Sequence, residues 1–229
     1  MLVNGGVMAE NKDRKVFVAK IEDLDNQPVE VLPGHTVAQR VRESEGFGFS
    51  EVVSTMEGEH PKLVFPEIQV EYKIIDGIAK FKFSEDGYIS LFKGANITIP
   101  AGRPYSFEGK FTCFMRCDPG FVQGSSILVD DDYQGIEKPF KEGGYEESIL
   151  ICNDDQPIHK NSEGLEVISV FSGTATFMVD GLPYVVSKSE LIVLPKNTSY
   201  SYSGLFSAFV RVDYQSKKEN SDDDELGNI

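Results

Sequence analysis

The chain has 229 residues, enough for one large domain or two small ones with hydrophobic cores of their own. It carries 22 basic and 37 acidic side chains, and a surface with a formal net charge of -15 repels the phosphate backbone of nucleic acids. No apolar run approaches the roughly 20 residues that span a bilayer, and the N-terminus lacks the apolar block of a secretory signal. We therefore expect a cytoplasmic protein with neither nucleic-acid nor membrane partners.

The predicted elements are short strands, recognised as runs of Val, Ile, Phe, Tyr and Thr that end at Gly, Asp, Asn or Pro. In chain order we expect a flexible segment (1–14), an N-terminal barrel (15–120), a connector (121–147), a C-terminal barrel (148–215) and an acidic disordered tail (216–229). Strands are expected at residues 51–56, 70–76, 78–83 and 97–102, and again at 148–153, 166–172, 174–179 and 191–195. The segment TVAQRVRES, residues 36–44, forms a single short helix or none.

The second half of the chain repeats the first. Residues 100–118 align with residues 195–213 at a constant offset of 95, and the residues around Gly77 align with those around Gly173 at an offset of 96. The identities at the first offset are Pro100/Pro195, Tyr105/Tyr200, Ser106/Ser201, Gly109/Gly204, Phe111/Phe206, Phe114/Phe209, Arg116/Arg211 and Asp118/Asp213. A unit of about 95 residues has the size of a domain. Short, evenly spaced strands then predict an all-β protein with two barrels side by side.

The spacing of residues in both halves resembles the cupin superfamily, whose motifs are G(X)5HXH(X)3-4E(X)6G and G(X)5PXG(X)2H(X)3N. In the second half, His159, Asn161, Glu166 and Gly173 keep the spacing of the first motif, with asparagine in place of the second histidine. Tyr200 stands where the second motif has its histidine. The resemblance implies a bicupin of two tandem jelly-roll β-barrels, over roughly residues 45–118 and 148–213, with degenerate metal-binding motifs.

Cupin motifs imply a divalent metal held by three histidines and a glutamate. In the first half, Phe65 and Val70 occupy ligand positions and cannot ligate, and Tyr105 replaces the third histidine. In the second half, one weakly held divalent metal would have His159, Asn161 and Glu166 as ligands, with the Tyr200 phenolate as a poor fourth ligand. The alternative is a barrel with no cofactor.

A barrel without a metal keeps its cavity. Period-two alternation puts Glu166 and Ile168 on one face of their strand, and Tyr200 and Tyr202 on one face of theirs. If those faces point inward, His159, Glu166 and Tyr200 form a catalytic set for proton transfer, as metal-free cupin-like epimerases use histidine and tyrosine. The ligand-binding residues would be Asn161, Ile168 and Tyr202 in this barrel, with Tyr72 and Tyr105 in an apolar pocket of the first.

Several of these residues also have structural interpretations. His159 follows a proline-containing turn, where exposed histidines are common, and a register slip of one residue would turn Glu166 toward solvent. Tyr105 and Tyr200 are equivalent in the repeat, which favours a shared structural hydrogen bond.

Other polar residues are expected to lie outside any functional site. Arg116-x-Asp118 and Arg211-x-Asp213 recur in both halves, and we interpret them as salt bridges or strand-end anchors. His35 and His60 follow glycine-containing turns and are expected to be exposed.

Three functions fit these patterns. The first is a non-redox isomerase, epimerase, cyclase or lyase that acts on a small polar metabolite in the C-terminal barrel. The second is a non-catalytic ligand-binding or scaffold protein, and the third is a metal-dependent oxygenase with a His/Asn/Glu site. The expected partners are a small-molecule ligand or substrate and a second copy of the chain, because cupin barrels often pair their sheets edge to edge.

Overall fold

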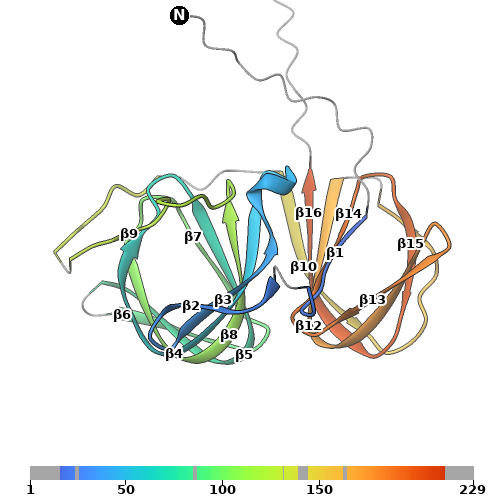
Figure 1. Ribbon diagram of the computed structural model, residues 1–229, viewed down its shortest axis with the longest axis horizontal. Helices are drawn as coiled ribbons and strands as arrows, with labels where there is room; N and C mark the ends of the chain where they lie inside the picture. Colours follow the sequence, from blue (N-terminus) through green and yellow to red (C-terminus); the bar gives the residue numbers. More distant parts are fainter. Residues whose placement is uncertain are drawn as a thin grey trace, which may run out of the picture.

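A computed structural model describes residues 16–23, 26–84, 87–130, 132–138, 144–161 and 164–214. The expected flexible segment and acidic tail lie outside the described residues. The described ranges form two antiparallel eight-stranded sheets, each closed into a jelly-roll barrel, and Figure 1 shows the barrels side by side. The all-β prediction with two tandem barrels is confirmed. The part of the chain that the structure describes contains no helix able to span a membrane.

The N-terminal barrel follows the strand order β2-β3-β4-β8-β5-β6, with β7 on β5 and β9 on β4. Its strands are β2 (Val29–Leu32), β3 (His35–Val41), β4 (Ser50–Val64), β5 (Gln69–Ser84), β6 (Gly87–Phe92), β7 (Asn96–Ile99), β8 (Tyr105–Asp118) and β9 (Ile127–Leu128). Residues 36–44 form no α-helix, because alternating side chains of β3 face the barrel interior; a short 3-10 helix follows at Glu43–Glu45.

The C-terminal barrel is built around β12, which pairs with β13, β14, β15 and β16. Its other strands are β1 (Phe17–Ala19), β10 (Tyr145–Cys152), β11 (His159–Lys160), β13 (Leu182–Ser187), β14 (Leu191–Leu194), β15 (Ser199–Ser203) and β16 (Phe206–Tyr214), and β12 itself spans Gly164–Val179. The expected connector thus includes β9 and the start of β10.

Strand β1 belongs to the C-terminal barrel, although it precedes the N-terminal one in sequence. Phe17 pairs with Val193 and Ala19 with Leu191 on β14, and Figure 1 shows β1 lying along that barrel. Ala19 is completely buried there. By strand pairing, the N-terminal barrel expected from residue 15 begins only at β2, because the edge of β14 offers β1 a backbone partner and an apolar surface.

Two long strands bend at glycines that the sequence pattern suggests as strand ends. β5 continues through Gly77 and β12 through Gly173, with register shifts beside each glycine. Both glycines have φ near +76°, and a Cβ at Gly77 would lie 2.1 Å from the carbonyl oxygen of Lys110 on β8. Glycine therefore lets each strand bend and stay paired, where a separate turn was expected.

Hydrophobic side chains form a core inside each barrel and further clusters between the barrels. Alternation along β12 separates them, since Ile168 points into the C-terminal core while Val167 packs between the barrels. Val53 and Phe114 of the N-terminal barrel meet Phe171 and Phe209 of the C-terminal one in a further cluster. Two separate apolar clusters thus join the barrels.

Candidate functional site

Glu166 and Tyr200 meet inside the C-terminal barrel. The Tyr200 hydroxyl donates a hydrogen bond of 2.9 Å to Oε1 of Glu166, and both side chains are buried. Burial raises the pKa of the Glu166 carboxyl, while the bond from Tyr200 acts in the opposite direction. Burial and the neighbouring carboxylate both raise the pKa of Tyr200. Ile168 and Tyr202 pack in the same buried cluster as Tyr200.

His159 lies outside this buried pair. Its side chain is exposed at the two-residue edge strand β11, where the backbone pairs with Tyr200 on β15. The imidazole stacks on the ring of Tyr202, with centroids 5.3 Å apart and ring planes within 11°. The structure therefore brings Glu166 and Tyr200 together inside the barrel and leaves His159 exposed, stacked on Tyr202.

The side chain of Asn161 is hydrogen-bonded to backbone groups. Its buried side-chain nitrogen donates to the carbonyl oxygens of Gly164 at 2.6 Å, Leu194 at 3.3 Å and Pro195 at 3.4 Å. Its side-chain oxygen accepts a bond of 3.4 Å from the amide of Gly164. These bonds connect Asn161 to the first residue of β12 and to the end of β14.

The proposed ligand set His159, Asn161 and Glu166 does not fit a metal centre. The histidine is exposed, the asparagine oxygen bonds the backbone, and the glutamate accepts from Tyr200. Within the described ranges, no group of three or more His, Cys, Asp or Glu side chains is arranged to hold a metal.

In the N-terminal barrel, Tyr105 is the counterpart of Tyr200, and its hydrogen-bond partner is a second tyrosine, Tyr72. The hydroxyls of Tyr72 and Tyr105 are 2.7 Å apart, and both side chains are fully buried. Burial raises the pKa of both phenols, so both stay protonated at neutral pH. One hydroxyl donates to the other, in keeping with the structural hydrogen bond expected for Tyr105.

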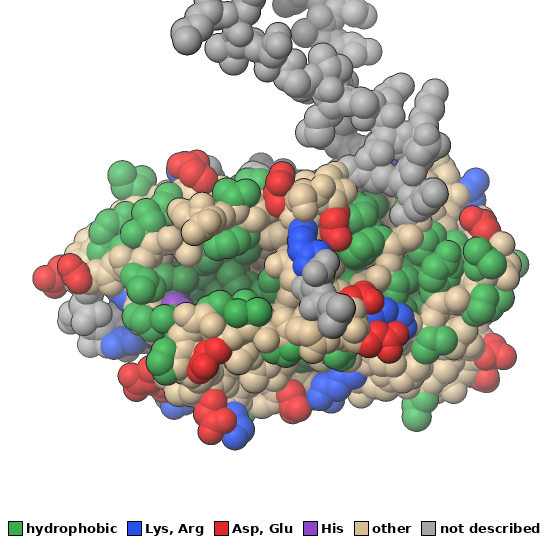
Figure 2. Space-filling model, viewed as in Figure 1, with side chains coloured by type: hydrophobic (Ala, Val, Ile, Leu, Met, Phe, Trp, Pro, Cys, Tyr) green, Lys and Arg blue, Asp and Glu red, His purple; other side chains and the backbone are tan. Residues whose placement is uncertain are grey.

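A cavity of about 690 Å³ opens beside this pair, in the N-terminal barrel. Figure 2 shows the hollow, lined by hydrophobic side chains with a histidine inside it. Its apolar walls come from strands β2, β3, β4 and β8 and from the segments that follow β4 and β8, and include Leu32, Val37, Val52, Leu63, Phe65, Phe107, Met115 and Phe121. The volume lies within the range of small-molecule sites.

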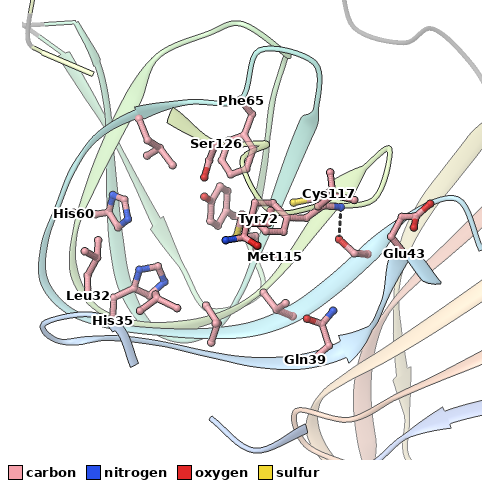
Figure 3. Close-up of a pocket in the computed structure, with 18 of the residues that line it drawn as sticks. Leu32, His35, Gln39, Glu43, His60, Phe65, Tyr72, Met115, Cys117 and Ser126 are labelled. Atoms are coloured by element: carbon pink, nitrogen blue, oxygen red, sulfur yellow. Dashed lines mark hydrogen bonds between the residues drawn. The ribbon is translucent and has the colours of Figure 1, made fainter. Parts of the chain in front are cut away.

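His35 and His60 provide the polar groups deep in this cavity. They lie beside each other at one end, opposite Glu43, as Figure 3 shows. Both are buried, with 6% and 8% of their surface exposed, and their ring centroids are 5.2 Å apart. The expectation that they are exposed is wrong, because β3 begins at His35 and β4 runs on through His60, so that both side chains point into the barrel.

The hydrogen bonds of the two histidines leave one ring nitrogen of each open. His60 Nδ1 lies 2.7 Å from the Pro61 carbonyl oxygen, and His35 Nε2 lies 2.9 Å from Ser54 Oγ. His35 Nδ1 is buried with no hydrogen-bond partner among the described residues, an arrangement that typically costs about 1–3 kcal/mol.

Both histidines are uncharged at neutral pH. Burial, together with the neighbouring His60, lowers the pKa of His35 from 6.5 to about 4. Burial also lowers the pKa of His60, against the opposing effect of its bond to Pro61. Cys117, another lining residue, keeps its proton because burial raises its pKa to about 12. The histidine end of the cavity therefore presents neutral hydrogen-bonding groups within apolar walls, whereas the charged residues Arg42 and Glu43 line the cavity elsewhere.

One sequence signal for this site was available. His35, Val37 and Gln39 alternate along β3, and all three line the cavity. The alternation indicates a strand with these residues on one face. The prediction of exposed histidines rests instead on the neighbouring segments Pro33-Gly34 and Glu57-Gly58-Glu59, because glycine and proline indicate turns.

The two barrels, their strand order and the cavity inside one of them define a bicupin fold. Solved structures with this fold include the protein YlbA from E. coli, at 14% identity and a TM-score of 0.64, covering 86% of this chain and 90% of that chain. A mutant oxalate decarboxylase OxdC from Bacillus subtilis matches at 11% identity and a TM-score of 0.64, over 93% of this chain and 79% of that chain. AerE from Microcystis aeruginosa matches at 10% identity and a TM-score of 0.59, over 82% and 96%.

At these identities the likeness shows the fold alone. A further structure of Bacillus subtilis oxalate decarboxylase, at 11% identity and a TM-score of 0.63, is described with Mn(II) centres. Neither the protein-family models nor the curated proteins contain a match to the chain.

Proposed function

We propose that this protein binds a small, uncharged and largely apolar molecule inside its N-terminal barrel. The observation that carries the proposal is the cavity of about 690 Å³, whose walls are apolar and whose deep polar groups are the neutral side chains of His35 and His60. A few convergent polar groups within apolar walls are typical of small-molecule sites. An ionised ligand would lose its hydration there without meeting an opposite charge at the histidine end.

Filling the cavity tests this function. Val52→Phe and Met115→Phe each add a larger side chain to the cavity wall, and Val185→Phe on the exposed face of β13 is the matched control. Naphthalene is a suitable probe, because the chain has no tryptophan and ligand fluorescence excited near 300 nm meets little background. We expect at least tenfold weaker binding in the two cavity variants and unchanged binding in the control. Equal binding in all proteins would contradict the proposal.

A second function, proton transfer in the C-terminal barrel, is favoured by one observation. The Tyr200–Glu166 hydrogen bond joins two buried ionisable groups, as an acid/base pair on a small polar metabolite requires. The exposed position of His159 weighs against a three-residue catalytic set. Solvent deuterium exchange into small sugars and hydroxy acids, followed by NMR, tests it: exchange that the wild type supports and Glu166→Gln abolishes is the expected result.

The remaining expectations stay predictions. A scaffold without a ligand is the alternative that the cavity test addresses, and light scattering tests the homodimer, which would double the 25.4 kDa mass of one chain. For the metal-dependent oxygenase, the arrangement of His159, Asn161 and Glu166 predicts well under one equivalent of iron, manganese or zinc in protein purified without chelator. Elemental analysis measures this, and stoichiometric metal would contradict it.

A further inference from the structure

The tautomer of His60 determines what its open nitrogen can recognise. A carbonyl oxygen can only accept a hydrogen bond, so the 2.7 Å contact with Pro61 requires that Nδ1 carries the proton. The ring is neutral at neutral pH, and a neutral imidazole with a proton on Nδ1 has a lone pair on Nε2. No hydrogen bond to this Nε2 comes from any residue that the structure describes, and the side chain lines the cavity.

His35 supplies an independent sign that a polar ligand atom belongs at this end. Its side chain is more than nine-tenths buried, lines the same cavity, and has an unpartnered Nδ1. Buried polar groups in folded proteins almost always have a partner, and those that lack one call for an explanation. Because the His35 and His60 rings are in edge contact, one ligand group can lie near both.

The surroundings of the two imidazoles are aromatic. The His60 ring stacks on Phe107, with centroids 4.5 Å apart and 22° between planes, and His35 meets Phe107 edge to face. Tyr72 and Phe65 continue the wall. Aromatic rings favour offset-stacked or edge-to-face contact with other rings.

We infer that the cavity, if it binds small molecules as proposed above, selects a neutral aromatic compound with a hydroxyl group, whose O–H donates to Nε2 of His60. The hydroxyl is the ligand's required donor, and the aromatic body lies against Phe107 and its neighbours. At the histidine end a carboxylate analogue is disfavoured, because it brings a negative charge and no donor to the lone pair of His60.

Three probes of similar size separate these requirements: 2-naphthol, which donates; 2-methoxynaphthalene, which only accepts; and 2-naphthoate, which is charged. We expect the wild type to bind 2-naphthol at least fivefold more tightly than 2-methoxynaphthalene and to bind 2-naphthoate most weakly. His60→Phe keeps a planar ring against Phe107 and removes the acceptor, so 2-methoxynaphthalene should still bind and the preference for 2-naphthol should disappear. His60→Gln, which retains an acceptor oxygen, should restore part of that preference.

The control variant is His159→Phe, which removes an exposed histidine from the other barrel. It should keep the full preference, and thermal melting should show that each variant is folded. Equal binding of 2-naphthol and 2-methoxynaphthalene by the wild type, or a preference that survives in His60→Phe, overturns this inference while the proposed binding function stands. If none of the probes binds, the binding function fails and this inference fails with it.

Discussion

His35 and His60 lie in the interior of the N-terminal barrel although each is close to a glycine-containing turn. Burial keeps both imidazoles neutral and turns two ordinary titratable groups into hydrogen-bonding groups of a mostly apolar cavity. In the other barrel, the Tyr200 hydroxyl donates its hydrogen bond to Glu166. At the scale of single residues, the open imidazole nitrogens are therefore in the N-terminal barrel, whereas the buried pair of the C-terminal barrel is already hydrogen-bonded.

Acid should destabilise the protein through His35. The pKa of His35 is about 4 in the folded chain, below the ordinary value of 6.5. Between these values the unfolded chain binds a proton that the folded chain does not, so the free energy of unfolding increases with pH in this window. We expect stability to be unaffected by this group above about pH 6.5 and to fall by about 3 kcal/mol as the pH approaches 4. Urea unfolding at several pH values measures the change.

The His35→Asn variant provides the comparison for this measurement. It should flatten the dependence of stability on pH between about 4 and 6.5, whereas His159→Asn, at an exposed position, should leave the dependence unchanged. A pH dependence that is the same in wild type and His35→Asn would contradict the assignment.

Tyr200→Phe should destabilise the C-terminal barrel by about 1–3 kcal/mol, because it leaves the buried Glu166 carboxyl without its donor. Tyr88→Phe is the control, since the Tyr88 side chain is 67% exposed; its effect should stay within about 0.5 kcal/mol. Chemical denaturation of both variants gives the comparison. A cost for Tyr200→Phe no larger than that of the control would show that the hydrogen bond is not needed for stability.

The long bent strands β5 and β12 are the elements that shape the barrels. Each one contributes to the barrel interior and to the interface between barrels, and each bends at a glycine with positive φ. Close approach of a neighbouring strand at these glycines leaves no room for a Cβ. The bend therefore recurs at equivalent positions of the two sequence repeats, Gly77 and Gly173.

Gly77→Ala should destabilise the protein by more than about 3 kcal/mol, because it combines a strained φ of +77° with a backbone clash against β8. Gly94→Ala is the matched control: φ is +88°, but no atom lies within 4 Å of its Cβ position. The control should cost only about 1 kcal/mol, the strain term alone. Thermal and urea unfolding measure both, and equal costs would show that the close approach at Gly77 relaxes freely.

The two barrels are joined by ion pairs that the repeat supplies twice. Arg116 of β8 pairs with Asp213 of β16 at 2.6 Å, and Arg211 of β16 pairs with Asp118 of β8 at 3.3 Å. Each arginine therefore binds the aspartate of the opposite barrel, and Arg211 also reaches Glu71 at 3.3 Å. The interpretation of the Arg-x-Asp repeats as salt bridges is confirmed: both arginines pair across to the other barrel, and Arg211 also pairs with Asp213 of its own strand at 2.7 Å.

Arg211→Met should destabilise the whole molecule by about 3–5 kcal/mol, because it leaves the buried Glu71 without one of its cations while the Met side chain fills similar space. Lys188→Met is the control: its pair with Asp76 is exposed and should contribute less than about 1 kcal/mol. Urea unfolding followed by circular dichroism compares the two. A loss below about 1 kcal/mol for Arg211→Met would show that the network between the barrels does not contribute to stability.

Much of this molecule follows from the sequence by itself. Strand patterning and the offset of 95 residues determine an all-β protein of two similar barrels, because alternation and glycine turns depend on neighbours along the chain. The same alternation predicts Ile168 on one strand face with Glu166, and Tyr200 on one face with Tyr202; the structure buries Ile168, Tyr200 and Tyr202 in one cluster. The Arg-x-Asp repeats likewise indicate charged pairs at the ends of equivalent strands.

Only the tertiary structure decided where β1 pairs and which barrel holds the cavity. The pairing of β1 with β14 depends on which strand edge lies open in three dimensions. The cavity depends on how completely side chains from β2, β3, β4 and β8 fill the barrel interior. The sequence pattern of each strand indicates which of its faces is buried, but it does not indicate whether the side chains of opposing strands are in contact. His35 and His60 converge because β3 and β4 lie next to each other in the N-terminal barrel. The chemistry of the site is therefore decided by packing across strands.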